Sequence, residues 1–174
     1  MMTVVNGIDL EIGNNIIETV KASPEFGKTM WRARTFWKGG TKSESEIRGF
    51  RVNIDEPRDL GGTDTAPNPV EMVLAALGSC LVVGYALNAA MLGIELQKIE
   101  IDMEGDIDLP GFFGLPSDKQ PGYTNIRARV FLKSAAGQEQ LEKIHNRVIS
   151  TSPVGLTLSK SVKLDIELVK RRTA

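Results

Sequence analysis

Apolar and polar side chains alternate along several stretches of the chain, as in strands whose successive residues face opposite sides of a sheet. Residues 28–37 and 45–54 form the first two stretches, and the segment Lys38–Thr41 between them, with two glycines, predicts a hairpin loop. Three more strands are predicted from these alternating residues: Ile99, Ile101 and Met103; Ile126, Ala128, Val130 and Leu132; and Val162, Leu164, Ile166 and Leu168.

Two other segments carry apolar residues at intervals of three and four, the spacing of one helix face. The segment 9–22 precedes Pro24, which predicts a short helix. A second apolar stripe runs from about 135 to 150, and Pro153 follows it, so this helix is predicted to close at that proline.

The longest apolar run extends from Val70 to Ile94 and contains one charged residue, Glu71. Its start carries helix signals: Asn68 suits the N-cap, Pro69 suits the first helical position, and Glu71 completes a capping box. Gly93 predicts the end of the helix. The run is long enough to cross a bilayer, but no cluster of Lys or Arg flanks it. We therefore predict a core helix enclosed on all sides by protein, and no membrane partner.

The predicted order is an N-terminal helix followed by β-β-α-β-β-α-β, without internal repeats. This order favours an α+β fold in which the long central helix packs against antiparallel sheets. A chain of 174 residues fits one domain with a substantial core, so residues 1–174 are predicted to form a single domain. The Gly- and Pro-rich stretch 105–122 predicts a long loop between two strands, and Phe112 and Phe113 pack within it or cover a pocket.

Charge and composition exclude several classes of partner and site. Lys and Arg number 21 against 22 Asp and Glu, so the chain has no basic field for nucleic acid. With one cysteine and one histidine, it cannot form an intrachain disulfide or a His/Cys zinc site within one subunit. We expect neither a metal nor an organic cofactor. The N-terminal residues lack the pattern of a signal peptide, and we predict a cytoplasmic location.

Cys80 is the only residue able to carry sulfur chemistry. It lies in the middle of the predicted central helix, within the stretch Ala75–Leu81. Taken alone, this position favours inert packing, because free cysteines are usually buried and behave as small hydrophobic residues.

Two further polar features have ordinary structural interpretations. His145 lies beside the apolar stripe of its helix, where a structural histidine is commoner than a catalytic one. An acidic alternation could hold a cation in principle, but a solvated strand face accounts for it more simply. Its members are Asp102, Glu104, Asp106 and Asp108.

Linked motifs along most of the chain resemble the signature of the OsmC/Ohr family of thiol-dependent hydroperoxide reductases. The resemblance implies an OsmC-like fold, a reactive cysteine at Cys80 on a central helix, a second site near Ser152, and an intertwined homodimer with its active sites at the interface. The motifs are Glu56–Gly62, Asn68-Pro69, Ala75–Cys80, Ser152-Pro153-Val154 and Thr157-Leu158.

Three positions depart from the family pattern. Ser152 stands where the peroxide-reducing members have a resolving cysteine, Val70 stands in the place of their glutamate, and Thr41 aligns loosely with their arginine. Glu71 is no substitute for the glutamate, because nine residues along a helix place it half a turn away from Cys80. Of the arginines on the predicted N-terminal strands, Arg34 is our candidate for a cation that stabilises the thiolate.

The resemblance implies thiol-dependent reduction of organic hydroperoxides through Cys80, as part of an oxidative stress response. Its partners would be a small-molecule alkyl or lipid hydroperoxide and an external thiol that recycles the cysteine. The alternative is a non-catalytic member of the family that binds an apolar ligand or acts as a thiol redox sensor. The missing partner residues favour this alternative.

Overall fold

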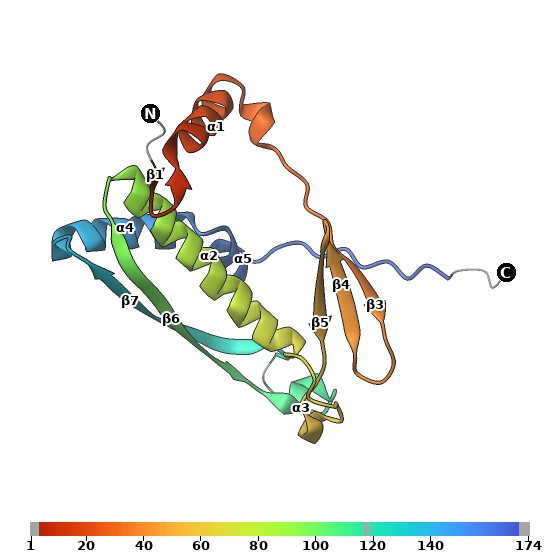
Figure 1. Cartoon of the computed structure of the whole chain (residues 1–174). Coiled ribbons are helices and arrows are strands. Elements are labelled where there is room, and N and C mark those ends of the chain that lie inside the picture. Colours follow the sequence, from red (N-terminus) through yellow and green to blue (C-terminus); the bar gives the residue numbers. More distant parts are fainter. Residues whose placement is uncertain (1–3, 117, 119, 171–174) are drawn as a thin grey trace.

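One long helix organises the structure, a computed structural model that describes residues 4–116, 118 and 120–170. The helix α2 (Pro69–Met91) lies on the sheet formed by β6 and β7, and it also contacts α4 and α5 (Figure 1). The bounds of these elements are β6 Leu96–Ile107, β7 Tyr123–Ser134, α4 Gln138–Thr151 and α5 Pro153–Ser159. The fold is α+β with antiparallel sheets and a long helix, as predicted from the sequence.

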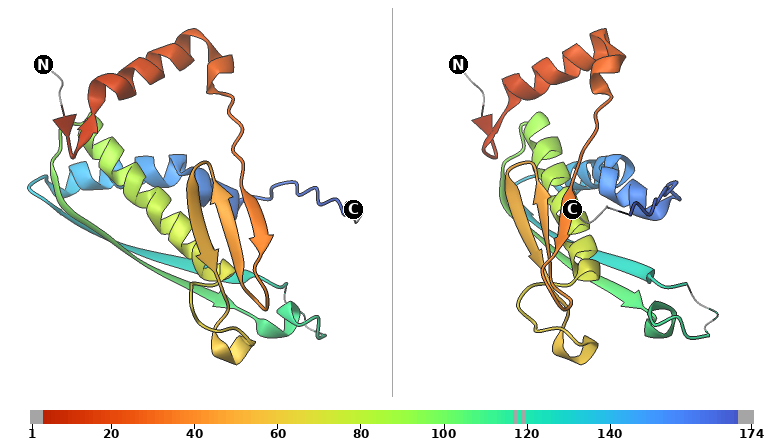
Figure 2. Two further views of the ribbon diagram at one scale, coloured as in Figure 1. Left: turned by 45° about the vertical axis from the view of Figure 1, so that its right-hand side comes forward. Right: turned by 90° about the vertical axis from the view of Figure 1, so that its right-hand side faces the viewer.

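Two smaller units stand at opposite ends of α2 (Figure 2). Near its C-terminal end, the paired strands β1 (Val4–Val5) and β2 (Ile8–Asp9) lead into α1 (Leu10–Ala22). Near its N-terminal end stands an antiparallel sheet in the order β3-β4-β5. Its strands are β3 Arg34–Trp37, β4 Ser43–Ile47 and β5 Phe50–Ile54. A short 3-10 turn and irregular residues connect the two units.

The core lies between α2, α4 and one face of the β6–β7 sheet. Four side chains of α2, each four residues apart, are buried: Leu77, Leu81, Tyr85 and Ala89. They pack against the buried Ile144 and Val148 of α4. From the sheet side, the alternating residues predicted from the sequence complete the cluster: Ile99, Ile101, Met103, Ile126, Val130 and Leu132.

His145 satisfies the one polar group that this core buries on α2. The Tyr85 hydroxyl lies 2.5 Å from His145 Nδ1, and burial raises the pKa of Tyr85. The structural interpretation of His145 is therefore confirmed.

The start of α2 is fixed by the capping box that the sequence predicts. The Asn68 side chain accepts from the Glu71 N–H at 2.8 Å, and Glu71 Oε2 accepts from the Asn68 N–H at 2.8 Å. At the other end, Gly93 adopts a left-handed φ of 67°, which stops the helix.

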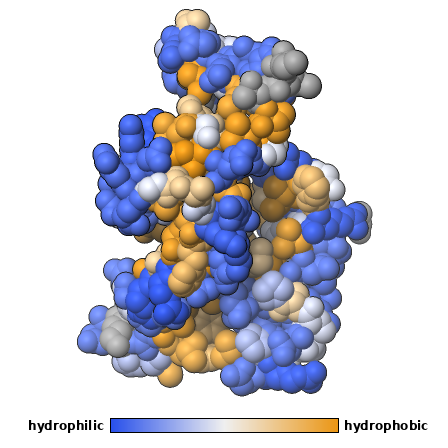
Figure 3. Space-filling view, turned by 60° about the vertical axis from the view of Figure 1, so that its left-hand side comes forward, coloured by the Kyte–Doolittle hydropathy of each residue, from blue (hydrophilic) through white to orange (hydrophobic). Residues whose placement is uncertain are grey.

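One face of α2 remains open, contrary to the prediction that protein encloses the helix on all sides. Val83 is 64% exposed, and Leu87 and Met91 are also exposed. Figure 3 shows apolar residues gathered in a band down one face of the molecule. By length and composition α2 could cross a membrane. Its regularly buried side chains are instead those of a core helix that lacks a cover on one side.

Two predicted N-terminal strands differ from the structure. In the stretch 28–37, only Arg34–Trp37 forms a strand. The stretch 45–54 is a hairpin rather than one strand, because the chain reverses at Arg48, with φ 58°, and Gly49. The hairpin loop at Lys38–Thr41 is confirmed, since β3 and β4 pair on either side of it.

The C-terminal elements also differ. Pro153 closes α4 as predicted but opens a further helix, α5, with Ser152 as its N-cap. The prediction of a strand at 162–168 is wrong for the single chain. The segment extends away from the body of the molecule without a neighbouring strand (Figure 1). Its apolar residues lie in solvent, and Leu168 is 98% exposed.

The loop predicted at 105–122 begins later, because β6 continues to Ile107 and the short helix α3 (Leu109–Phe112) follows. Phe112 and Phe113 are exposed and stack edge to face on each other, with ring centroids 5.1 Å apart. Residues 117 and 119 of this stretch, like residues 1–3 and 171–174, lie outside the described residues.

Asn68→Ala should lower the free energy of unfolding by about 1 kcal/mol, because it removes the acceptor that caps α2. Glu71→Gln should lower it much less, since glutamine also closes a capping box. Urea denaturation of both variants measures the difference. A larger loss from Glu71→Gln than from Asn68→Ala would contradict a capping role for Glu71.

Candidate functional site

The structure brings Cys80 and Ser152 together from positions 72 residues apart. The Cys80 Sγ lies 3.3 Å from the Ser152 Oγ. Cys80 projects from the middle of α2 and is half-buried, whereas Ser152, at the junction of α4 and α5, is buried. Cys80 is therefore partly accessible to solvent, whereas its polar neighbour Ser152 is held in place by burial.

Close approach of α2 and α4 makes this contact possible. At Gly84, one turn after Cys80, a Cβ atom would lie 3.0 Å from Val148 Cγ1. Val148 in turn lies one turn before Ser152. A larger residue at position 84 would push α4 outward and separate the sulfur from the hydroxyl.

The capping role of Ser152 uses its hydroxyl oxygen as an acceptor and leaves its hydrogen free to donate. Ser152 Oγ accepts from the Gly155 N–H at 3.1 Å, which caps α5. While Cys80 is protonated, either the thiol or the Ser152 hydroxyl can donate in the 3.3 Å contact. A thiolate can only accept, so the Ser152 hydroxyl is the donor whenever Cys80 is ionised.

A cavity of about 500 Å³ opens beside the pair. Leu77, one turn before Cys80, and Gly155, which binds the Ser152 hydroxyl, form part of its wall. The rest of the lining comes from β7 and α5: Tyr123, Thr124, Asn125, Ile126, Ala128, Leu158 and Ser159. Most of this lining is apolar or small, with a few hydroxyl and amide groups.

Arg34 lies on β3, in the sheet beyond the N-terminal end of α2. Its guanidinium carbon stacks 4.8 Å from the centroid of the Phe36 ring. In the part of the chain that the structure describes, the hydrogen-bond partner of Cys80 is Ser152 rather than an arginine. A role for Arg34 at the sulfur stays a prediction, and it requires an approach that one chain does not provide.

Sequence reasoning missed Asp55, a buried carboxylate that binds three threonines. Its oxygens accept from the hydroxyls of Thr41 at 2.7 Å, Thr63 at 2.5 Å and Thr65 at 2.9 Å. They also accept from the backbone N–H groups of Thr63, Thr65 and Glu56. The hydrogen bonds from Thr63 and Thr41 hold the pKa of Asp55 well below its usual range.

This carboxylate ties the β3–β4 hairpin loop to the loop that leads into α2. Thr41, which the family resemblance aligns loosely with an arginine, is therefore engaged by Asp55. The sequence does contain a signal, because an aspartate followed by a Thr-Asp-Thr segment is rich in side chains that bind backbone and carboxylate groups in loops. Nothing in the spacing, however, indicates that all three hydroxyls converge.

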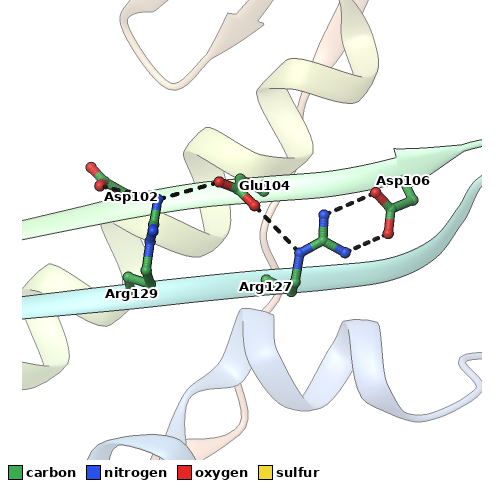
Figure 4. Close-up of polar contacts among 5 residues, drawn as sticks. All are labelled: Asp102, Glu104, Asp106, Arg127 and Arg129. Atoms are coloured by element: carbon green, nitrogen blue, oxygen red, sulfur yellow. Dashed lines mark hydrogen bonds and ion pairs between the residues drawn. The ribbon is translucent and has the colours of Figure 1, made fainter.

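The acidic alternation on β6 pairs with arginines on the neighbouring strand (Figure 4). Arg127 binds Glu104 and Asp106, and its hydrogen bonds lower the pKa of Asp106. Arg129 reaches Glu104 and Asp102. All of these side chains are about half exposed or more, so the stripe is a solvated strand face that contributes little to stability.

Comparison with known proteins places this arrangement in a family. Residues 62–167 match the family model described as OsmC-like protein. A solved OsmC-like protein from Mycoplasma pneumoniae superposes with a TM-score of 0.66 at 16% identity, over 76% of this chain and 89% of that one.

Two other proteins are also similar to this chain, one in structure and one in sequence. An organic hydroperoxide resistance protein, OsmC, from Legionella pneumophila gives a TM-score of 0.57 at 17% identity, over 75% of this chain and 91% of that one. The uncharacterized protein YmaD of Bacillus subtilis is 23% identical over 137 residues, which cover 76% of this chain and 85% of YmaD.

Asp55 should make the fold sensitive to acid. Because its pKa is lower in the folded than in the unfolded chain, its stabilising effect is present above the unfolded value of about 4 and is lost as the pH falls below it. Asp55→Asn should lower the melting temperature near neutral pH, and the gap to wild type should narrow towards about pH 3. The exposed neighbour Asp59→Asn is the matched control. An equal gap at both pH values would contradict this role.

Proposed function

Because the chain belongs to the OsmC-like protein family, we propose that it reduces organic hydroperoxides through Cys80, with electrons from an external thiol. The observation that carries this proposal is the 3.3 Å contact between the Cys80 sulfur and the buried Ser152 hydroxyl, beside a cavity. The contact gives the only cysteine a hydrogen-bond donor for its ionised form, and the neighbouring cavity, whose wall includes Leu77 and Gly155, supports the approach of a substrate.

The proposed reaction takes two stages. The Cys80 thiolate attacks the O–O bond: an S–O bond forms, the O–O bond breaks, and the alkoxide takes a proton to leave as an alcohol. The resulting sulfenic acid then reacts with one external thiol, which releases water and leaves a mixed disulfide. A second thiol attacks this disulfide and returns Cys80 to the reduced form, with the two external thiols joined as a disulfide.

Ser152 decides how the oxidised cysteine is recycled. The family resemblance puts it at the position of the resolving cysteine, and its hydroxyl lies close to Cys80 but offers oxygen in place of sulfur. The first oxidation product therefore finds no internal sulfur to form a disulfide. We propose a one-cysteine peroxidase that depends on free thiols, which the reducing cytoplasm supplies.

The cavity favours substrates with an apolar body. Leu77, Ile126 and Leu158 contribute to its wall, and burial of an alkyl chain contributes about 0.8 kcal/mol per methylene. Alkyl or lipid hydroperoxides fit this lining better than hydrogen peroxide, which gains nothing from apolar contacts.

The position of Arg34 favours a second candidate function. Within one chain no cation meets the sulfur among the described residues, and Thr41 is held by Asp55. A thiol without a cation reacts slowly. This supports a non-catalytic protein that binds an apolar ligand or senses thiol oxidation, unless a second chain supplies the missing group.

We propose that the second chain is another copy of this protein. The open face of α2 exposes Val83 and Leu87, and the segment 162–168 has a strand pattern without a strand partner. A homodimer that covers the middle of α2, at Val83 and Leu87, and pairs this segment satisfies both features and leaves the C-terminal end of the helix uncovered. It could also bring the β3–β5 sheet of one copy, with Arg34, towards Cys80 of the other.

Intact mass spectrometry tests the chemistry at Cys80. One equivalent of cumene hydroperoxide should add one oxygen, and excess oxidant should add two or three, because Ser152 cannot trap the sulfenic acid. A small thiol should convert the first product to an adduct. Cys80→Ser should show none of these additions. If folded wild type gains no oxygen under excess hydroperoxide while the unfolded chain does, Cys80 serves packing only.

Ser152→Cys tests the geometry of the pair. The variant should form an internal disulfide on oxidation, because the native side-chain atoms are already 3.3 Å apart. The matched control is Ser150→Cys, whose residue is exposed one half-turn earlier on α4. It should form no internal disulfide, and non-reducing peptide mapping distinguishes the two. Equal disulfide formation in both would contradict the placement of Ser152 beside Cys80.

Native mass spectrometry at micromolar concentration should show twice the 19.0 kDa chain mass. Val83→Asp should shift the protein towards the monomer, because it places a charge on the open face of α2. The exposed Glu142→Asp, on α4, serves as a control that leaves that face unchanged. A monomer alone in the wild-type spectrum would exclude the dimer and with it the approach of Arg34.

A further inference from the structure

A second cavity, of about 510 Å³, lies between the C-terminal half of α2 and α4. Its apolar part is formed by Met91 and Leu92 at the end of α2 and by the buried Ile144 of α4. Its polar part includes Lys143, Arg147 and the amides of Asn88 and Asn146. The cavity has the size and the mixed lining of a small-molecule site.

Among the described residues, none forms an ion pair with either of the two cations in this cavity. Lys143 and Arg147 are four residues apart on α4 and so lie on the same face of the helix. Within the described part of the chain, neither side chain takes part in an ion pair or a hydrogen bond, whereas Arg127 and Arg129 each bind two carboxylates. No acidic residue contributes to the cavity wall within that described part.

We infer that this cavity binds a monocarboxylate with an apolar tail, such as a medium-chain fatty acid. Lys143 and Arg147 attract the carboxylate, and the planar guanidinium of Arg147 can bind both of its oxygens. The tail lies against Met91, Leu92 and Ile144. A small anion would leave this apolar wall in water, and a neutral amphiphile would leave the two cations unpaired.

The site is separate from the sulfur. Cys80 and Asn88 are eight residues apart, about 12 Å along the axis of α2. The cavity beside Cys80 shares no lining residue with this one among the residues that the structure describes. The inference therefore does not depend on peroxide reduction, and a fatty acid held here need not carry a peroxide.

Isothermal titration of the full-length protein with decanoate, below its micelle concentration, tests the inference. We expect saturable binding, with an affinity that rises by up to about fourfold for each added methylene between octanoate and dodecanoate. Acetate should not bind detectably, and decanol should bind more weakly than decanoate. Equal binding of decanol and decanoate, or no saturable binding of any chain length, would overturn the inference.

Variants locate the bound carboxylate. The double variant Lys143→Gln/Arg147→Gln should bind decanoate at least about fivefold more weakly, since two charge-assisted contacts are lost. Met91→Glu should also weaken binding, because it adds a negative charge to the wall. Lys160→Gln, at an exposed lysine outside the cavity, should bind like wild type. The circular dichroism spectrum and the melting temperature of each variant should match those of wild type, which shows that a change in binding does not come from unfolding.

Two further measurements distinguish this cavity from the cavity beside the sulfur and from a membrane-binding surface. Cys80→Ser should retain decanoate binding, even if it abolishes the reaction with hydroperoxide. Loss of binding in Cys80→Ser together with retention in the double variant would assign the fatty acid to the cavity beside the sulfur and overturn the inference. Binding to anionic lipid vesicles without binding to decanoate would assign the cations to a membrane surface and would also overturn it.

Discussion

The close contact between α2 and α4 determines where the chemically distinctive side chains of this protein lie. The two helices run antiparallel, and Gly84 lets Val148 approach closely, because a Cβ atom at position 84 would lie 3.0 Å from Val148 Cγ1 and would require Val148 to shift. One turn away in one direction, the same alignment places Cys80 opposite Ser152. One turn away in the other, it places Asn88 and Ile144 around a second cavity. A shift between the helices would therefore change both sites at once, because interiors are close-packed and transmit displacement.

The sequence predicts those parts of the fold that depend on local signals. The capping box at Asn68 and the left-handed Gly93 fix both ends of α2, and the alternating residues of β6 and β7 do face the core. The reversal at Arg48 was missed because the residues on both sides continue the alternating pattern. The segment 162–168 has the side-chain pattern of a strand, but a strand also needs hydrogen bonds to a neighbour, and the described part of one chain contains no such neighbour for it.

The site could be predicted only in part, for a related reason. The composition identifies Cys80 as the one thiol, but its distance from Ser152 depends on helix packing, which no local pattern encodes. The resemblance to a family supplied that pairing, and the structure agrees with it. For Asp55, no family resemblance pointed to the site. Three threonine hydroxyls converge on its carboxylate because of the way two loops fold. A role for Arg34 at the sulfur stays a prediction, because it requires a second chain, which neither local patterns nor a single chain can supply.

The exposed C-terminal segment affects how a single chain behaves during and after its synthesis. The described core closes with α5, so the body can collapse while residues 160–170 are still leaving the ribosome. In a lone chain, these residues are an unpaired β segment that invites non-specific aggregation. From Val162 to Leu168 a charged residue separates each apolar residue from the next, and Lys163 pairs with Asp165 at 3.1 Å. Such gatekeeper charges disfavour stacking of identical segments from many chains. They leave the segment free to pair with one matching surface.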